Sequence, residues 1–182
     1  MRLSESRHLG SNPSPAAMTK IFLPPKIEEV NPPLIFLAGP IQGAKHWQNE
    51  AIKIIQKLNP AINIASPRRD YLDGEFVYEA QVDWETRYLN EAAKKGLILF
   101  WLAKEAEHDG KRSYAQTSRF ELAEWKVKHE RDGVKLVLGI EDGFTGARYI
   151  RHRFSQDCSE IPILDSLEET CEKAVEMLTT KF

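Results

Sequence analysis

Four short runs rich in apolar residues do most to limit what this chain can fold into. They read LIFLAGP at 34–40, AINIASP at 61–67, LILFWL at 97–102 and VKLVLGI at 134–140. A strand with one solvated face alternates apolar and polar residues, whereas a continuous apolar run is typical of a strand buried on both faces. Burial of that kind occurs in parallel sheets covered by helices, so the runs predict a mostly parallel sheet.

Stretches with helical spacing of apolar residues separate these runs. We expect helices over 46–58, 77–95, 117–133 and 167–180. Gly96 follows the second of them and Gly133 closes the third, since glycine is common where a helix ends. The alternation predicts an open α/β domain. YIRHRF (149–154) and IPILDS (161–166) are interpreted as further short strands, which gives a sheet of about five strands.

Composition agrees with a single globular domain. The chain has 182 residues, of which 42% are hydrophobic and 29% charged, and its net charge is −2. That balance gives no support for nucleic-acid binding, which usually needs a basic face. No apolar run reaches the roughly 18 residues of a membrane helix. We therefore expect a domain over 33–182 after a flexible polar tail at 1–20, in a cytoplasmic protein without nucleic-acid or membrane partners.

Neither a metal nor a cofactor is expected from the sequence. The two cysteines, Cys158 and Cys171, are too few for a disulfide framework or a metal cluster. The five histidines show no ligand spacing. The glycine fingerprints of dinucleotide and P-loop sites are missing as well.

A turn and a pair of arginines are expected at the ligand-binding edge of the sheet. Right-handed crossovers bring the carboxyl ends of parallel strands to one edge, where ligands of such folds bind. Gly39, Pro40 and Ile41 follow the first run and are candidate substrate contacts, although an ordinary strand-end turn explains them equally well. Arg68 and Arg69 follow the second run and suit a phosphate or carboxylate. The alternative is ion pairing with the nearby acids Asp70, Asp73 and Glu75.

Glu121 is the first candidate for a catalytic carboxylate, because it lies near the start of the helix that leaves this edge. The alternative is a capping box, in which Ser118 and Glu121 bond each other's backbone N–H groups. One carboxylate rotamer cannot serve both roles. Ser118 is itself a candidate substrate contact.

The motif QVDWE at 81–85 supplies two further acids. Asp83 and Glu85 diverge because residues two apart in a helix do not share a face, so only one is expected to reach the site. Trp84 is more typical of the core. The loop acids Glu105, Glu107 and Asp109 are the alternative source of a second functional carboxyl.

Together, IFLAGPI, SPRR, QVDWETRYLNEAAKKGLILFWL and TSRFELAEW resemble the nucleoside 2-deoxyribosyltransferase-like proteins over about 33–150. The resemblance implies a flavodoxin-like, doubly wound α/β fold with helices on both faces. It also implies cleavage of the N-glycosidic bond of a nucleoside or nucleotide, transfer to a base or water, and a homo-oligomer.

The resemblance also assigns roles to residues. Glu121 matches the family nucleophile. From the residues themselves, because Glu85 lies on a predicted helix beside Trp84, we expect it to assist the leaving base and to approach Glu121 within about 5 to 7 Å. We expect Asp83 to contact the substrate.

Two positions depart from the family pattern. Lys95-Gly96 stands where an aspartate is common, and Ala123 stands where a glycine is common and is expected to narrow the pocket. A nucleotide-binding module without chemistry is therefore the alternative function.

Overall fold

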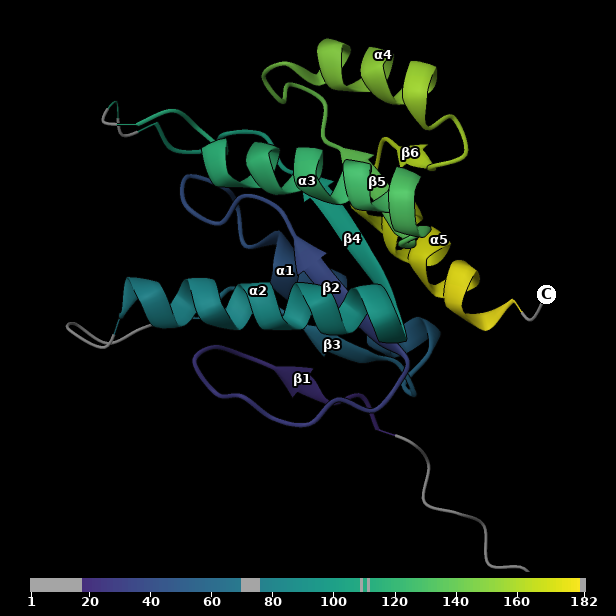
Figure 1. Cartoon of the computed structure of the whole chain (residues 1–182). Coiled ribbons are helices and arrows are strands. Elements are labelled where there is room, and N and C mark those ends of the chain that lie inside the picture. The colour runs from purple at the N-terminus through teal and green to yellow at the C-terminus, as the bar shows by residue number, and fades with distance from the viewer. Residues whose placement is uncertain (1–17, 70–75, 109, 111, 181–182) are drawn as a thin grey trace, which may run out of the picture.

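A computed structural model describes residues 18–69, 76–108, 110 and 112–180 (Figure 1). Within these residues, six parallel strands form one sheet in the order β1-β3-β2-β4-β5-β6. The strands are β1 (Ile21–Phe22), β2 (Leu34–Ala38), β3 (Asn63–Ala65), β4 (Gly96–Leu102), β5 (Leu136–Ile140) and β6 (Ile163–Leu164). The helices are α1 (Trp47–Leu58), α2 (Tyr78–Lys95), α3 (Gln116–Asp132), α4 (Ala147–Asp157) and α5 (Leu167–Thr179).

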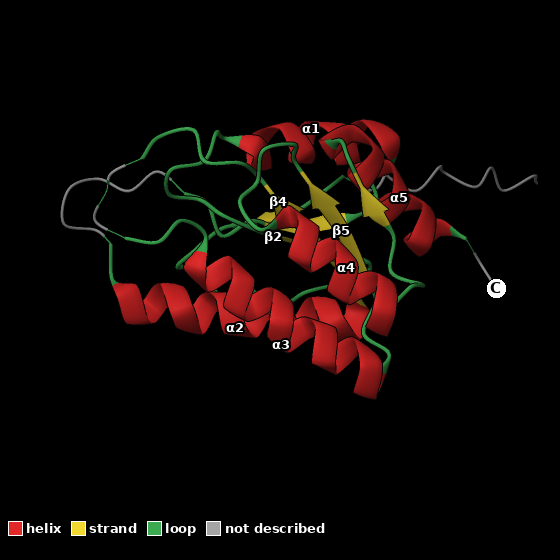
Figure 2. Cartoon of the chain, turned by 90° about the horizontal axis from the view of Figure 1, so that it is seen from above, coloured by secondary structure: helices red, strands yellow, loops and turns green. Residues whose placement is uncertain are grey.

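The sheet is doubly wound, which confirms the predicted flavodoxin-like fold. Helices α1 and α5 cover one face, and α2, α3 and α4 cover the other (Figure 2). After β2 the chain adds β3 on one side and later β4 on the other. The strand order therefore reverses between β2 and β4, the position at which folds of this kind bind ligands.

Two hydrophobic layers meet at β4. Ile98, Phe100 and Leu102 pack toward α2 and α3, whereas Leu97, Leu99 and Trp101 pack toward α1 and α5. None of these six side chains is more than 5% exposed. Each fully buried side chain of this size contributes roughly 1.5 to 3 kcal/mol from its apolar surface. Burial on both faces explains why the run carries no polar alternation.

The segment at 149–154 is not a strand, contrary to the prediction. It lies within α4, where Ile150 and Phe154 are one helical turn apart and both pack on the core. The charged and polar residues between them face outward. The helical spacing of these apolar residues therefore decides the structure, and the β-branched and aromatic content of the six-residue segment does not. The strand predicted at 161–166 is confirmed by β6.

The sheet also begins earlier in the chain than predicted. The short strand β1 pairs with β3, and its Phe22 packs against Tyr88 with ring centroids 5.2 Å apart. Thr19 donates a hydrogen bond to the carbonyl of Pro60, and the backbone N–H of Lys20 donates to Asn63 Oδ1. Residues 19–22 thus belong to the folded unit, while 1–17 lie outside the described residues.

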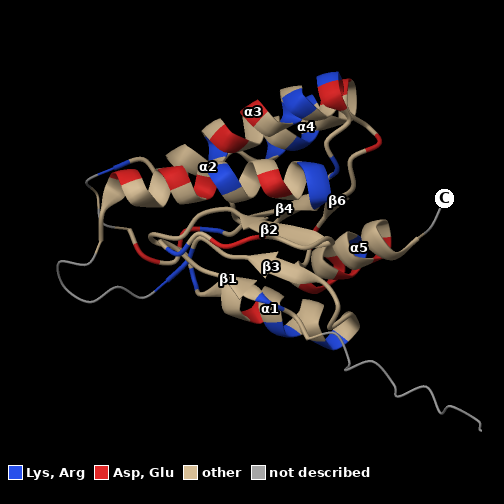
Figure 3. Ribbon diagram, turned by 60° about the horizontal axis from the view of Figure 1, so that its bottom comes forward, with Lys and Arg blue, Asp and Glu red and all other residues tan. Residues whose placement is uncertain are grey.

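Charges of both signs are interleaved along the outer faces of the helices (Figure 3). Among the described helices, none is long and apolar enough to cross a lipid bilayer.

Candidate active site

A pocket of about 520 Å³ opens at the carboxyl edge of the sheet, beside the switch point. Its walls come from the turn after β2, from Pro67 and Arg69 after β3, from the first half of α2, and from residues between 112 and 121. This volume lies in the usual range for small-molecule sites. The side-by-side packing of α2 and α3 over one face of the sheet brings their amino-terminal halves to the same pocket (Figures 1 and 2).

The turn after β2 forms the floor of the pocket, and Gly39, Pro40 and Ile41 all line it as expected. Gly39 has a φ of +148°, and a Cβ placed there would lie 2.2 Å from the carbonyl oxygen of Trp101. Only glycine fits such a close approach of two backbones. The indole N–H of Trp47 donates to the carbonyl of Pro40 at 2.9 Å and holds the turn from below.

Among the described residues, two carboxyl side chains line the pocket, Glu85 from α2 and Glu121 from α3. Burial raises the pKa of Glu121 to about 8, and the negative charges of Glu85 and Glu124 act in the same direction. Burial also raises the pKa of Glu85, opposed by a hydrogen bond from Gln81. A half-buried carboxyl whose pKa is raised to about 8 is largely protonated at neutral pH, so the pair retains a proton there.

The capping box, which was the alternative role for Glu121, is not formed. Helix α3 begins at Gln116 after Ala115, which has a left-handed φ of 54°, and no side chain caps its first turn. Ser118 is the third residue of the helix and Glu121 lies in the second turn. Their spacing fits a capping box, but Ser118 does not occupy the N-cap position that the box requires. Both side chains line the pocket instead, and Ser118 is only 5% exposed.

Gln81 is a pocket residue to which the sequence analysis gave no role. Its side-chain nitrogen donates to the carbonyl of Pro67 at 2.9 Å and to Oε1 of Glu85 at 2.7 Å. The spacing of four residues to Glu85 was the available signal, because such residues are neighbours on a helix surface.

The structure brings Glu85, and not Asp83, to the pocket. Asp83 is exposed on α2 and is not among the lining residues. Trp84 is fully buried on the core side of the helix, where its indole N–H donates to the carbonyl of Lys26. The expected divergence of Asp83 and Glu85 is thus observed.

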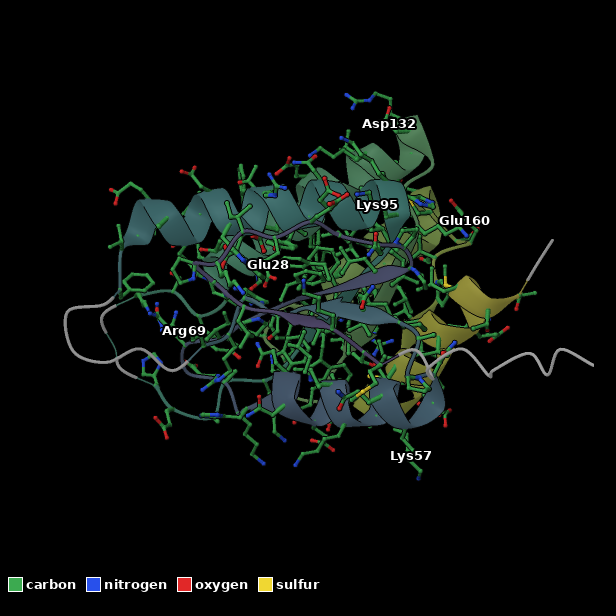
Figure 4. All side chains as sticks on the ribbon, turned by 90° about the horizontal axis from the view of Figure 1, so that it is seen from below. Glu28, Lys57, Arg69, Lys95, Asp132 and Glu160 are labelled. Atoms are coloured by element: carbon green, nitrogen blue, oxygen red, sulfur yellow. The ribbon has the colours of Figure 1, made fainter. Side chains whose placement is uncertain are left out.

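The two adjacent arginines point to neighbouring hollows. Arg69 lines the main pocket and donates to the carbonyl of Pro24 at 3.0 Å, and Figure 4 shows it at the opposite end of the molecule from Lys57. Arg68 lines a side hollow of about 440 Å³ together with Lys45 and His46. It donates to the carbonyl of Ile41 at 3.2 Å and contacts the ring of His46. The alternative partners Asp70, Asp73 and Glu75 lie outside the described residues.

The loop acids do not reach the main pocket where the structure describes them. Glu105 bonds His108 at 2.9 Å, and Glu107 lines the side hollow. Asp109 lies outside the described residues. The same part of the chain contains no group of three His, Cys, Asp or Glu side chains placed to hold a metal ion.

Comparison with protein families identifies the family of the chain. The family model described as "Nucleoside 2-deoxyribosyltransferase like" matches residues 32–142, which run from just before β2 to just beyond β5. The chain belongs to this nucleoside 2-deoxyribosyltransferase-like family. A search of curated proteins finds no match. The matched segment contains every residue that lines the pocket.

Both departures from the family pattern lie away from the pocket of this nucleoside 2-deoxyribosyltransferase-like protein. Gly96 pairs with Leu34 at the amino-terminal edge of the sheet, and Lys95 donates to the carbonyl of Val30 and pairs with Glu91. Ala123 is exposed on α3 and is not among the lining residues, so the expectation that it narrows the pocket is wrong.

Replacing Glu121 by glutamine is expected to stabilise the protein at alkaline pH. The pKa of Glu121 is raised in the folded state, so the stability that the protonated group supplies is complete below its ordinary pKa and is lost as pH rises through about 8. Glutamine cannot ionise. Glu121→Gln should raise the free energy of unfolding by roughly 2 kcal/mol at pH 9 and change it little below pH 5, measured by urea unfolding.

The matched control is Glu124→Gln on the same helix. Glu124 is exposed and pairs with Lys128 at 2.6 Å. An exposed pair of this kind contributes at most about 1 kcal/mol, so this variant should not gain stability at pH 9. If both variants had the same free energy of unfolding at pH 9, the raised pKa of Glu121 would be contradicted.

Proposed function

We propose that the protein cleaves the N-glycosidic bond of a nucleoside or nucleotide through a covalent glycosyl intermediate on Glu121. The observation that carries the proposal is the pair of half-buried carboxyls, Glu85 and Glu121, which line one pocket and whose pKa values burial raises. The alternative of a binding module without chemistry predicts Glu121 locked in a capping box and no second carboxyl in the pocket. Helix α3 has no side-chain cap, and a second carboxyl, that of Glu85, lines the pocket.

The pair supplies both groups that the reaction needs. An ionised oxygen of Glu121 attacks the anomeric carbon while the bond from that carbon to the base nitrogen breaks. Glu85 gives its proton to the departing base. In the second step water, or another base, attacks the same carbon, Glu121 leaves as a carboxylate, and the proton of the attacking group passes to Glu85.

The unfavourable ionisation of Glu121 suits this chemistry. Burial destabilises its carboxylate in the empty pocket. An oxocarbenium-like sugar carries positive charge next to that carboxylate, and the charge is greatest in the transition state. The attraction is therefore stronger in the transition state than in the ground state, which is the condition for catalysis.

The remaining walls fit the rest of such a substrate. The backbone at Gly39 and Pro40 allows close approach of a sugar, and Ser118 offers a hydroxyl inside the pocket. We further propose a homo-oligomer, since Phe120 next to the nucleophile is 73% exposed and an exposed aromatic residue is typical of an interface.

Glu121→Gln is expected to lower turnover by about 1000-fold or more, because the amide cannot form the glycosyl ester. The assay incubates the protein with a panel of nucleosides and their monophosphates, with and without free adenine or cytosine, and follows base release by chromatography. Mass spectrometry of the quenched wild-type reaction should find one added glycosyl group on the peptide that carries Glu121.

Glu124→Gln again serves as the control, and it should retain activity. Wild-type turnover in the Glu121→Gln variant would reject Glu121 as the nucleophile.

The pH profile is expected to be a bell, because only the singly protonated pair has both a nucleophile and an acid. As pH rises through about 8, the last proton leaves the pair and kcat/KM falls. At low pH both carboxyls are protonated and kcat/KM falls again. Glu85→Gln should remove the alkaline limb, since no acid remains to be lost. Retention of that limb in Glu85→Gln would transfer the acid role to another residue.

A substrate phosphate is expected to bind Arg68 or Arg69. Alanine at the arginine that binds it should raise KM for a nucleoside monophosphate about tenfold and leave the parent nucleoside unaffected, since guanidinium groups bind phosphate through two N–H donors. Lys57→Ala, at the opposite end of the molecule, is the control for loss of a positive charge (Figure 4). Equal turnover of nucleoside and monophosphate in all variants would leave the arginines with a structural role alone.

A further inference from the structure

The side-chain amide of Gln81 holds one oxygen of Glu85 in a fixed environment. Gln81 is 9% exposed and lies one helical turn before Glu85 on α2. The same nitrogen, Nε2, lies 2.9 Å from the carbonyl oxygen of Pro67 and 2.7 Å from Oε1 of Glu85. Both hydrogens of the amide group are therefore donated, one to the backbone and one to the carboxyl.

The Pro67 carbonyl decides which way this amide faces. A peptide carbonyl only accepts hydrogen bonds, and an amide nitrogen only donates them. The reversed amide would set its oxygen against Pro67 and Glu85 Oε1 together, so the nitrogen must face both. Pro67 itself is held at the end of β3, because the backbone N–H of Ser66 donates to Phe22 at 3.0 Å. The donor is thus anchored on the sheet and not only on its own helix.

We propose that Gln81 is a positioning residue that keeps Oε1 of Glu85 free of a proton. The proton retained by the two carboxyls then resides on Oε2 of Glu85 or on Glu121. When Glu121 ionises to attack, its proton passes to Glu85, and Oε2 is the oxygen of Glu85 that receives the proton and from which the base is then protonated. Gln81 therefore sets both the distribution of the proton and the direction in which it is delivered.

The surroundings of the two carboxyls are unequal in the way that the proposal requires. Gln81 donates to Glu85, and among the described residues no donor bonds Glu121. The hydrogen bond lowers the pKa of Glu85 against the effect of burial, whereas the charges of Glu85 and Glu124 raise that of Glu121 further. In the part of the chain that the structure describes, the other titratable side chains that line the pocket are Arg69, Tyr78 and Arg112.

A titration of the carboxyl groups tests the proposal without any substrate. The ¹³Cδ signals of labelled glutamates are followed by NMR against pH, and Glu85→Gln and Glu121→Gln assign the two signals. In the wild-type protein Glu85 should lose its proton at lower pH than Glu121. In Gln81→Met, which keeps the length of the side chain but removes the donor, the titration of Glu85 should move upward by about one pH unit. Asn90→Leu, an exposed site on the same helix, should leave both titrations unchanged.

A second arm measures catalysis and rests on the proposed function. In Gln81→Met the acid limb of the kcat/KM profile should move upward with the titration of Glu85, and kcat should fall about tenfold. A purely structural effect would lower the whole profile without moving its limbs. If the titrations behave as expected and no nucleoside or nucleotide is cleaved, the proposed function fails and the role of Gln81 stands.

Two results would overturn the inference. One is an unchanged titration of Glu85 in a folded Gln81→Met variant. The other is a wild-type protein in which Glu121 titrates first, which decides the matter even if the variant does not fold.

Discussion

Burial of β4 on both faces is the constraint from which the rest of the structure follows. Its side chains enter both hydrophobic layers, and its backbone pairs with β2 on one side and β5 on the other. At its carboxyl end the carbonyl of Trp101 lies so close to Gly39 that no side chain fits between the strands. The floor of the pocket is therefore fixed by sheet packing, and the helices only have to bring their acids to its edge.

Placing two acids at that edge opposes stability. The apolar surroundings of α2 and α3 that hold the helices on the sheet also remove water from Glu85 and Glu121, and both become weaker acids. Elsewhere on α3 an acid such as Glu124 remains exposed and pairs with a lysine. Selection for stability alone would not favour removing acids such as Glu85 and Glu121 from water. The contrast between neighbouring glutamates on one helix thus supports a functional role for Glu121.

The fold could be predicted from the sequence because strands buried on both faces are continuous apolar runs. The geometry of a helix also correctly predicted that Glu85 and Asp83 point in different directions. The failures have local causes. Strand β1 is two residues long and is soon followed by two prolines, and the apolar side chains of α4 that mark it as a helix are only one turn apart. The capping box failed because the left-handed Ala115, invisible in a sequence pattern, starts α3 earlier. A role for Gln81 was not predicted because its side chain bonds other groups of the protein, Pro67 and Glu85, and not a substrate.

The distribution of polarity within the pocket places the two halves of a nucleoside in the proposed reaction. Phe76, Tyr78 and Val82 are at least 39% exposed and form an apolar rim at the start of α2. Glu85 and Glu121 lie deeper, being only partly accessible. A nucleobase has flat apolar faces and suits the rim, while the sugar must reach the carboxyls. The bond between them then falls at the boundary of the two regions. We therefore propose that Glu85, on the helix that carries most of the rim, lies nearer to the base, and that Glu121, on the neighbouring helix, lies nearer to the sugar. The position of the rim thus supports the proposed assignment of acid and nucleophile.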